Sequence, residues 1–137
     1  MGLYLCIFDL DQEIDGVDVG HYSDFGVFRQ TVSAELEEEH AGARFPTLML
    51  HSDCDGQWSV EQCRQLEGEL NVIADAFRVL PPRAFSSEWQ ASLAKQLGLR
   101  PTSLADSFID VDGEPLIERL IELASLAKDR DLPILFQ

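Results

Sequence analysis

Residues 59–80 read SVEQCRQLEGELNVIADAFRVL and carry the strongest helical periodicity in the chain. Ser59 and Gln62 have the spacing of an N-terminal capping box, and the prolines at 81 and 82 stop the helix. We therefore expect a long helix that packs one apolar face against a sheet. The apolar positions recur at alternating steps of three and four residues and are Cys63, Leu66, Leu70, Ile73, Phe77 and Leu80.

Short apolar runs on either side of this helix predict the strands. Residues 3–8, LYLCIF, form a continuous apolar run closed by an acid, which is typical of a strand buried on both faces. Similar runs predict strands at 45–50, 107–111 and 133–136. The acidic stretch 9–20 predicts a turn and a short edge strand, where carboxylates discourage pairing with other chains.

Three further segments have helical spacing, at 23–42, 87–98 and 114–128, and a brief helical turn is expected after Pro101. The run of glutamates near the end of the first segment opposes the helix dipole, which favours cations at a C-terminus. Together the elements predict an α+β fold. We expect a single domain over 1–137, with a four- or five-stranded mixed sheet and three to four helices packed against it.

The chain is strongly acidic. Its 137 residues hold 25 Asp and Glu against 10 Lys and Arg, a net charge of −15. Phosphate backbones and anionic membrane surfaces repel such a charge, so neither nucleic acid nor a membrane is expected as partner. No apolar run reaches the ~18 residues of a membrane span, and no basic residue precedes Arg29, so we expect no signal peptide and a cytoplasmic location. The three cysteines contain no Cys-x-x-Cys pair, which predicts reduced thiols.

An enzymatic interpretation starts at the end of the first strand. The order Phe8-Asp-Leu-Asp11 is similar to the first motif of haloacid-dehalogenase-like phosphatases, a nucleophilic Asp followed two residues later by an acid–base Asp. Gln12-Glu13 replaces the Gly or Thr expected next, and the chain is short for that core and its cap. Solvated carboxylates at strand ends are a far commoner explanation of such a motif, so a magnesium-dependent phosphohydrolase is kept only as the alternative function. Its remaining roles would fall to Ser52, Lys95, Asp110 and Asp112.

A calcium-binding module is the third interpretation. Residues 51–62 overlay a twelve-residue calcium loop at Asp53, Asp55 and Gly56, its third, fifth and sixth positions. His51 is a poor first ligand for calcium, and Gln62 replaces the bidentate Glu of the last position. An Asx-type turn before the long helix accounts for the same residues.

The cysteines and tryptophans have simpler interpretations than catalysis. Cys63 lies on the apolar face of the long helix, and carboxylates around Cys54 disfavour a reactive thiolate. Trp89 has helical spacing and is expected in the core. Trp58 precedes the long helix and is equally compatible with burial or with an exposed position, where tryptophan is a common interface anchor.

The negative charge is concentrated near the start of the chain. Residues 1–40 hold ten acidic and one basic side chains, a net charge of −9. A solvated surface that keeps the protein soluble is sufficient to explain this excess. A surface that captures a basic protein by electrostatic steering explains it as well. The predicted partner-binding residues are Asp15, Asp18, Glu37, Glu38, Glu39, Asp53, Asp55 and Trp58.

Segments spread over nearly the whole chain form a recognisable pattern. They are 1–6 (MGLYLC), 24–25 (DF), 44–56 (RFPTLMLHSDCDG) with Trp58, 97–101 (LGLRP), 108–115 (FIDVDGEP) and 133–137 (PILFQ). This pattern resembles the bacterial immunity protein 70 family of polymorphic toxin systems. The resemblance implies an α+β protein that binds and silences a toxin of its own cell or its siblings, without catalytic residue, cofactor or metal.

The resemblance and the charge agree on a non-enzymatic inhibitor. A toxin that acts on nucleic acid presents a basic cleft, which an acidic surface complements. The sequence therefore predicts an immunity protein whose partner is a cognate toxin domain, with a nuclease as the toxin that fits best.

Overall fold

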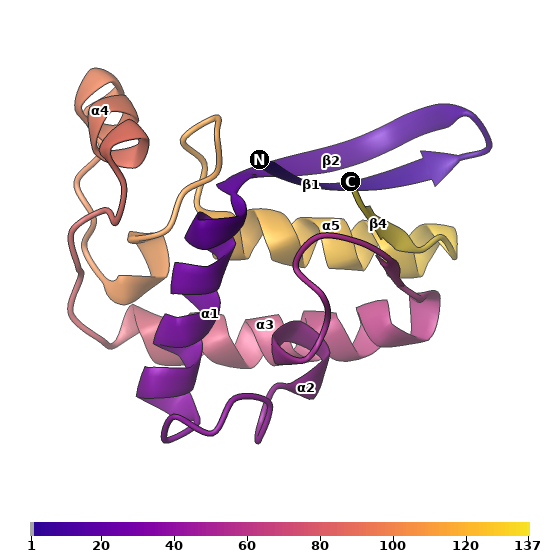
Figure 1. The fold of residues 1–137 in the computed structure, drawn as a ribbon, viewed down its shortest axis with the longest axis horizontal. Helices are drawn as coiled ribbons and strands as arrows, with labels where there is room; N and C mark the ends of the chain where they lie inside the picture. Colours follow the sequence, from indigo (N-terminus) through magenta and orange to yellow (C-terminus); the bar gives the residue numbers. More distant parts are fainter. Residues whose placement is uncertain (1) are drawn as a thin grey trace.

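The computed structural model describes residues 2–137 and contains one four-stranded sheet and five α-helices (Figure 1). This is the predicted α+β class, with the lower of the two predicted strand numbers. The strands are β1 (Gly2–Asp9), β2 (Gln12–His21), β3 (Gln57–Trp58) and β4 (Ile134–Phe136). The helices are α1 (Tyr22–Leu36), α2 (Pro46–Met49), α3 (Val60–Arg78), α4 (Glu88–Leu97) and α5 (Leu116–Arg130), with a 3-10 turn at Leu104–Asp106.

The strands are ordered β2-β1-β4-β3, and each neighbouring pair is antiparallel. The sheet is thus antiparallel throughout rather than mixed, because β1 and β2 form a direct hairpin and β4 returns beside β1. Leu3, Leu5 and Ile7 of β1 are fully buried on the face that meets the helices. Cys6 is also fully buried, but it belongs to the opposite face, because side chains alternate along a strand.

Helix α3 confirms the prediction drawn from its periodicity. It begins after Ser59, whose hydroxyl accepts a hydrogen bond from the N–H of Gln62 at 3.2 Å. Helix α5 lies beside α3, and both run beneath the sheet (Figure 1). The buried residues of α3 are Cys63, Leu66, Leu70, Ile73, Ala74 and Phe77.

Residues 45–50 do not form the predicted strand, since Pro46–Met49 make the single helical turn α2. Glu69 of α3 accepts hydrogen bonds from the N–H groups of Thr47 (3.1 Å) and Leu48 (2.9 Å), donors that a helix start leaves free. Proline is favoured at the first helical position for the same reason. The strand that completes the sheet is β3, which follows the 51–56 loop.

Residues 107–111 also lie outside the sheet, where the sequence predicts a strand. The buried carboxylate of Asp110 accepts hydrogen bonds from the N–H groups of Asp112 (2.9 Å) and Glu114 (3.0 Å). This side chain folds the segment into an Asx-type turn, which competes with strand pairing.

A side chain holds the start of α1, and the backbone turns at its end. At its start, the carboxylate of Asp24 accepts a hydrogen bond from the indole N–H of Trp89 in α4, which is half-buried and lies outside the core in which the sequence placed it. At its end, the helix stops at Leu36, earlier than predicted. Glu38 and Glu39 adopt left-handed φ angles of 52° and 65°, a conformation that ends a helix.

Candidate functional site

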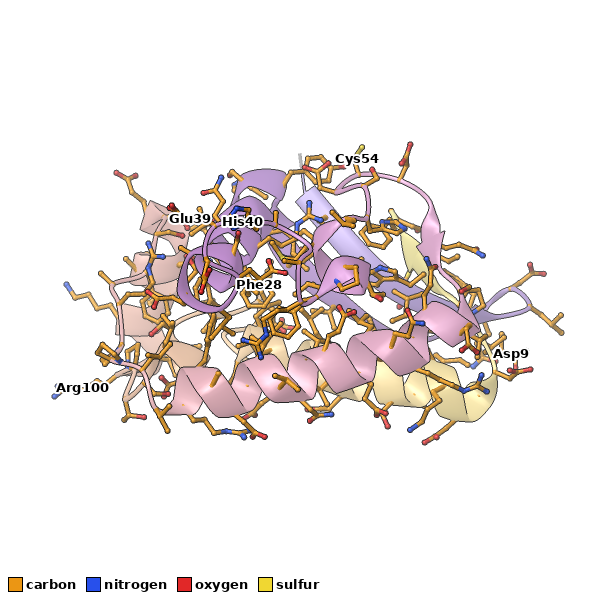
Figure 2. The ribbon with its side chains drawn as sticks, turned by 90° about the horizontal axis from the view of Figure 1, so that it is seen from below. Asp9, Phe28, Glu39, His40, Cys54 and Arg100 are labelled. Atoms are coloured by element: carbon orange, nitrogen blue, oxygen red, sulfur yellow. The ribbon has the colours of Figure 1, made fainter. Side chains whose placement is uncertain are left out.

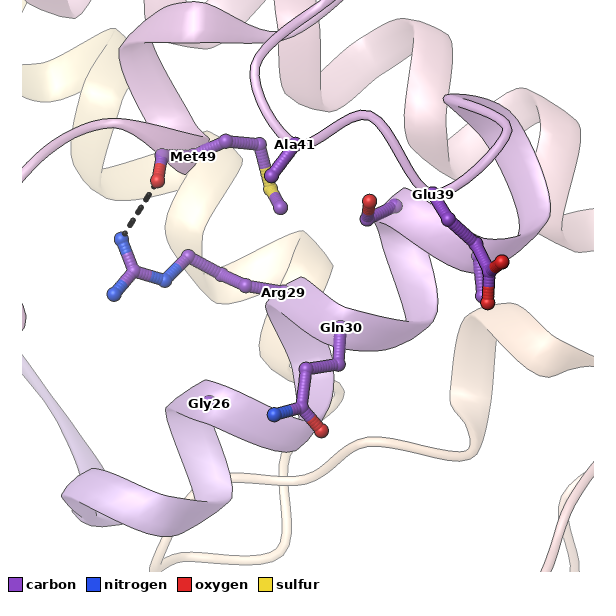
Figure 3. A pocket seen from close by; sticks show the side chains of 8 residues that line it. Gly26, Arg29, Gln30, Glu39, Ala41 and Met49 are labelled. Atoms are coloured by element: carbon purple, nitrogen blue, oxygen red, sulfur yellow. Dashed lines mark hydrogen bonds between the residues drawn. The ribbon is translucent and has the colours of Figure 1, made fainter.

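A hollow in the surface lies along one side of α1 and measures about 570 Å³ (Figure 3). Small residues of α1 at helical spacing form its floor. They leave room between α1 and the segment that packs across this helix. We call this feature the α1 hollow. Its lining residues are Gly26, Arg29, Gln30, Ser33 and Ala34 of α1, Glu39 and Ala41 of the following turn, and Met49 of α2.

Arg29 connects α1, the floor of the α1 hollow, to the segment around α2, which forms its wall. One guanidinium nitrogen donates to the carbonyls of Leu48 (3.2 Å), Met49 (3.3 Å) and His51 (2.8 Å), and the group stacks 4.6 Å from the centre of the Phe25 ring. Burial lowers the pKa of Arg29, while the nearby charge of Asp53 opposes that shift. Arg29 therefore acts as a structural tether and leaves the rim of the hollow acidic.

Glu37 does not take the exposed position that the acidic surface required. Its side chain is 3% exposed, and its carboxylate accepts hydrogen bonds from the N–H groups of Gly42 (3.2 Å), Arg44 (2.9 Å) and Phe45 (3.0 Å). Glu37 therefore stabilises the fold by organising the turn that leads into α2, and it is not available as the partner-binding residue that the sequence predicted.

Glu38 and Glu39, in contrast, are exposed. Both have left-handed φ angles, and Glu39 lines the α1 hollow. Figure 2 shows Glu39 and Cys54 towards the same side of the molecule. The turn after α1 and the 51–56 loop thus each carry exposed carboxylates.

The 51–56 loop is organised by His51. One ring nitrogen contacts the carbonyl of Ser52 at 2.8 Å, the other contacts that of Gln57 at 2.9 Å, and the ring stacks on Phe136 at 4.2 Å. Asp53 is half-buried near Arg29 and Asp55 is exposed. Within residues 2–137, no three His, Cys, Asp or Glu side chains gather as a metal site would require.

Trp58 is fully buried, so it cannot serve as an exposed anchor in this structure. Its indole N–H donates to the carbonyl of Thr47 at 3.0 Å, and its ring packs edge-on against Phe136 at 4.7 Å. The position of this tryptophan before a helix cap is compatible with burial or exposure, so the sequence did not decide between them.

Asp15 and Asp18 occupy different surroundings on β2. Asp15 is half-buried and pairs with Arg119 of α5 at 3.2 Å. Asp18 is exposed, and its only side-chain hydrogen bond within residues 2–137 comes from the N–H of Gly20 at 3.2 Å. Of the two, Asp18 is the carboxylate that a partner can reach.

The carboxylates of the phosphatase interpretation lie apart. Asp9 and Asp11 are exposed at the tip of the β1–β2 hairpin, which Figure 2 shows at one end of the molecule. Asp110 is 2% exposed and lies 3.9 Å from the guanidinium of Arg119. Burial raises the pKa of Asp110, and the hydrogen bonds from its own turn oppose that shift. These contacts give Asp110 a role in holding the turn beside α5.

Sequence reasoning missed Arg29 and the α1 hollow. The signals were present, since Arg29 lies four residues after Phe25, and small residues recur at helical spacing along α1. The carbonyls that Arg29 binds could not be found this way, because they depend on how the chain returns after α2.

The geometry describes a small acidic α+β protein whose prominent surfaces carry carboxylates, and among residues 2–137 no helix has the length and apolarity to cross a membrane. The chain belongs to the immunity protein 70 family, whose family model matches residues 3–136. It is therefore an immunity protein of a toxin system. Searches of curated proteins and of solved structures find no match to the chain.

Proposed function

We propose that this immunity protein binds its cognate toxin directly and silences it without catalysis. The observation that carries the proposal is membership of the immunity protein 70 family, supported by a net charge of −15. A toxin that acts on nucleic acid must attract phosphate and so presents basic residues, which this charge complements. A nuclease is the toxin class that we favour. Its capture would take place in the cytoplasm, a reducing compartment that suits three unpaired cysteines.

The residues that we assign to toxin binding are the members of the predicted set whose side chains are neither buried nor held in an ion pair, because a buried or paired carboxylate is already committed to the fold. Glu37 and Trp58 are buried, and Asp15 is paired with Arg119. The remaining residues are Asp18, Glu38, Glu39, Asp53 and Asp55.

Growth rescue tests the function itself. The toxin to test is the C-terminal domain of a large secreted protein, if the gene next to that of this chain encodes one, and we call this domain the neighbouring toxin domain. Cells that produce this domain should stop growing, and co-production of the immunity protein should restore growth. Persistent arrest in the presence of folded immunity protein would rule the assignment out for that toxin.

Association kinetics test the electrostatic part separately. Steering by exposed carboxylates raises the on-rate at low salt and weakens as salt shortens the Debye length to ~8 Å at physiological ionic strength. The Glu38→Gln, Glu39→Gln double variant should associate more slowly at low salt, with a shallower dependence on salt. An on-rate that equals the native value across salt concentrations would remove these two residues from the binding surface.

A further inference from the structure

One face of the sheet is left without a covering helix by residues 2–137. Helices α3 and α5 run beneath the sheet, and Figure 1 shows the other side of β1 and β2 open. The side chains of Tyr4 and Phe8 in β1 and Leu135 in β4 point to this open side and are half-buried. They lie outside the hydrophobic core that the inward side chains form with the helices.

Aromatic and acidic residues alternate across this open face. The register of β1 and β2 sets Tyr4 opposite Asp18 and Phe8 opposite Glu13. Directly opposed residues in antiparallel strands have Cβ atoms roughly 4.5–5.5 Å apart, so each ring has a carboxylate beside it. We call Tyr4, Phe8, Leu135, Glu13 and Asp18 the sheet-face patch.

Gly16 has no side chain and so leaves room for the ring of Tyr4 over β2. A Cβ atom on Gly16 would overlap the phenol ring of Tyr4, which shows that the ring lies flat across β2. Burial raises the pKa of Tyr4 to about 12, and a hydrogen bond and the charge of Glu13 add to that shift. The ring is therefore neutral and held beside a carboxylate.

The charge of the patch is uncompensated. The four strands contain no Lys or Arg, and among residues 2–137 Glu13 and Asp18 form no ion pair. Asp15 on the same strand differs, because Arg119 neutralises it. A cation that reaches the open face thus meets two carboxylates that no Lys or Arg of the described residues neutralises.

The outer edge of β2 already forms hydrogen bonds to other parts of the chain. This favours docking of a partner on the open face of the sheet over addition of a partner strand to this edge. The carbonyl of Gly16 accepts a hydrogen bond from Arg119 at 3.0 Å, and the carbonyl of Asp18 accepts one from the N–H of Val111 at 3.0 Å. A partner strand that added to this edge would have to displace both bonds.

We propose that the sheet-face patch is the docking surface for a basic segment of the toxin, with an arginine of that segment stacked on Tyr4 or Phe8 and paired with Asp18 or Glu13. The inference rests on the proposed function and deepens it. Arginine fits better than lysine because its planar guanidinium stacks on aromatic rings and binds carboxylates through two parallel hydrogen bonds. Rings surrounded by charge are typical of the residues that dominate interface energies.

Isosteric variants test the patch with the neighbouring toxin domain as probe. Glu13→Gln with Asp18→Asn removes two charges but keeps the carbonyl oxygens that serve the local hydrogen bonds, and Phe8→Leu keeps apolar bulk while removing the ring. Each should weaken the Kd by about tenfold or more, as expected for interface hot spots. The matched control, Glu88→Gln with Asp129→Asn, removes two exposed charges from α4 and α5 and should stay within about twofold. Equal affinities for patch and control variants would overturn the inference.

Methyl-resolved NMR on the complex locates the docking surface independently of any variant. Toxin binding should shift the methyl signals of Leu135 more than that of Met49 in the α1 hollow. Shifts confined to Met49 would overturn the inference while leaving the proposed function intact. A concentration-dependent homodimer that Phe8→Leu abolishes would also overturn it, because a second copy would then cover the patch. Failure of growth rescue and of all binding would reject the proposed function as well.

Discussion

The buried carboxylate of Glu37 accepts a hydrogen bond from the N–H of Phe45 at 3.0 Å, which joins the end of α1 to the start of α2. The same carboxylate also accepts hydrogen bonds from Gly42 and Arg44, so one side chain organises the whole turn. Its neighbour Glu38 is exposed and has no such partners among residues 2–137. The two adjacent glutamates therefore have different roles, since Glu37 stabilises the fold and Glu38 belongs to the exposed surface.

Removal of the Glu37 carboxylate should destabilise the protein. Glu37→Ala leaves backbone N–H groups of the turn without partners, at a cost of about 1–3 kcal/mol in the free energy of unfolding. Glu38→Ala is the matched control and should change that free energy by about 0.5 kcal/mol or less. Chemical denaturation measures both variants, and similar losses for the two would contradict the assigned roles.

Arg29 should matter for stability more than an exposed arginine. Arg29→Met removes the hydrogen bonds to three carbonyls after and within α2, so we expect a loss of about 1–3 kcal/mol. Hydrogen exchange should quicken in residues 48–57. Arg64→Met, which breaks only a surface pair with Glu61, should cost about 1 kcal/mol or less. Unchanged exchange in Arg29→Met would show that the tether does not hold the loop.

The ion pair between Lys128 and Glu67 predicts a pH dependence of stability. A hydrogen bond from Lys128 at 2.8 Å holds the pKa of Glu67 below its ordinary value of 4.5, and Glu67 raises the pKa of Lys128 above 10.5. The acid's contribution is complete above the unfolded pKa and is lost as pH falls through the lower folded pKa. The lysine's contribution is lost as pH rises through its raised pKa.

Comparison with Glu67→Gln isolates this contribution. The difference in unfolding free energy between the native protein and the variant should be largest between these two limits and shrink towards both acid and alkaline pH. A difference that stays constant over the whole range would show that the pair contributes through packing alone.

Thiol reactivity should distinguish the three cysteines. Cys54 is exposed, whereas Cys6 and Cys63 are buried, and burial raises the pKa of Cys6 and that of Cys63, the latter to about 11. One thiol per native chain should react quickly, and unfolding should release the other two. Phe8→Ala should make Cys6 reactive as well, because the two residues share the open side of the sheet.

Leu50→Ala is the control for this experiment, since it shortens an apolar side chain that is 68% exposed and lies outside the four strands. Its labelling should match that of the native protein. Protection of Cys6 in Phe8→Ala would mean that the ring is not what covers this thiol.

Local patterns were sufficient to predict the long elements. The stripe from Cys63 to Phe77 is a property of α3 alone, and the apolar run of β1 needed no knowledge of its neighbours. α2 could not be predicted in this way. An apolar run of this length suits a strand or a helix, and Glu69, 22 residues after Thr47 in the chain, decides between them.

The sequence predicted the negative charge of the candidate site but not which of its carboxylates are exposed. Composition alone gave the excess of carboxylates over the first 40 residues. Which of them face solvent depends on long-range partners, such as Arg119 for Asp15 and the returning backbone for Glu37. The aromatic members of the sheet-face patch were hidden for another reason, because a continuous apolar strand reads as buried on both faces.

The pairing of β1 with β4 has a consequence for synthesis on the ribosome. The N–H of Tyr4 donates to the carbonyl of Gln137, and the N–H of Gln137 donates to that of Tyr4, so the two ends of the described chain lie together (Figure 1). Residues 2–9 are translated before the rest of the described chain, yet β4, their neighbour in the middle of the sheet, is translated long after them. The nascent hairpin must therefore wait, with its aromatic side chains exposed, until residue 136 emerges. Contacts of such long sequence separation slow folding. The same proximity makes a circular permutant, with residues 2 and 137 joined by a short linker, a natural way to remove that delay.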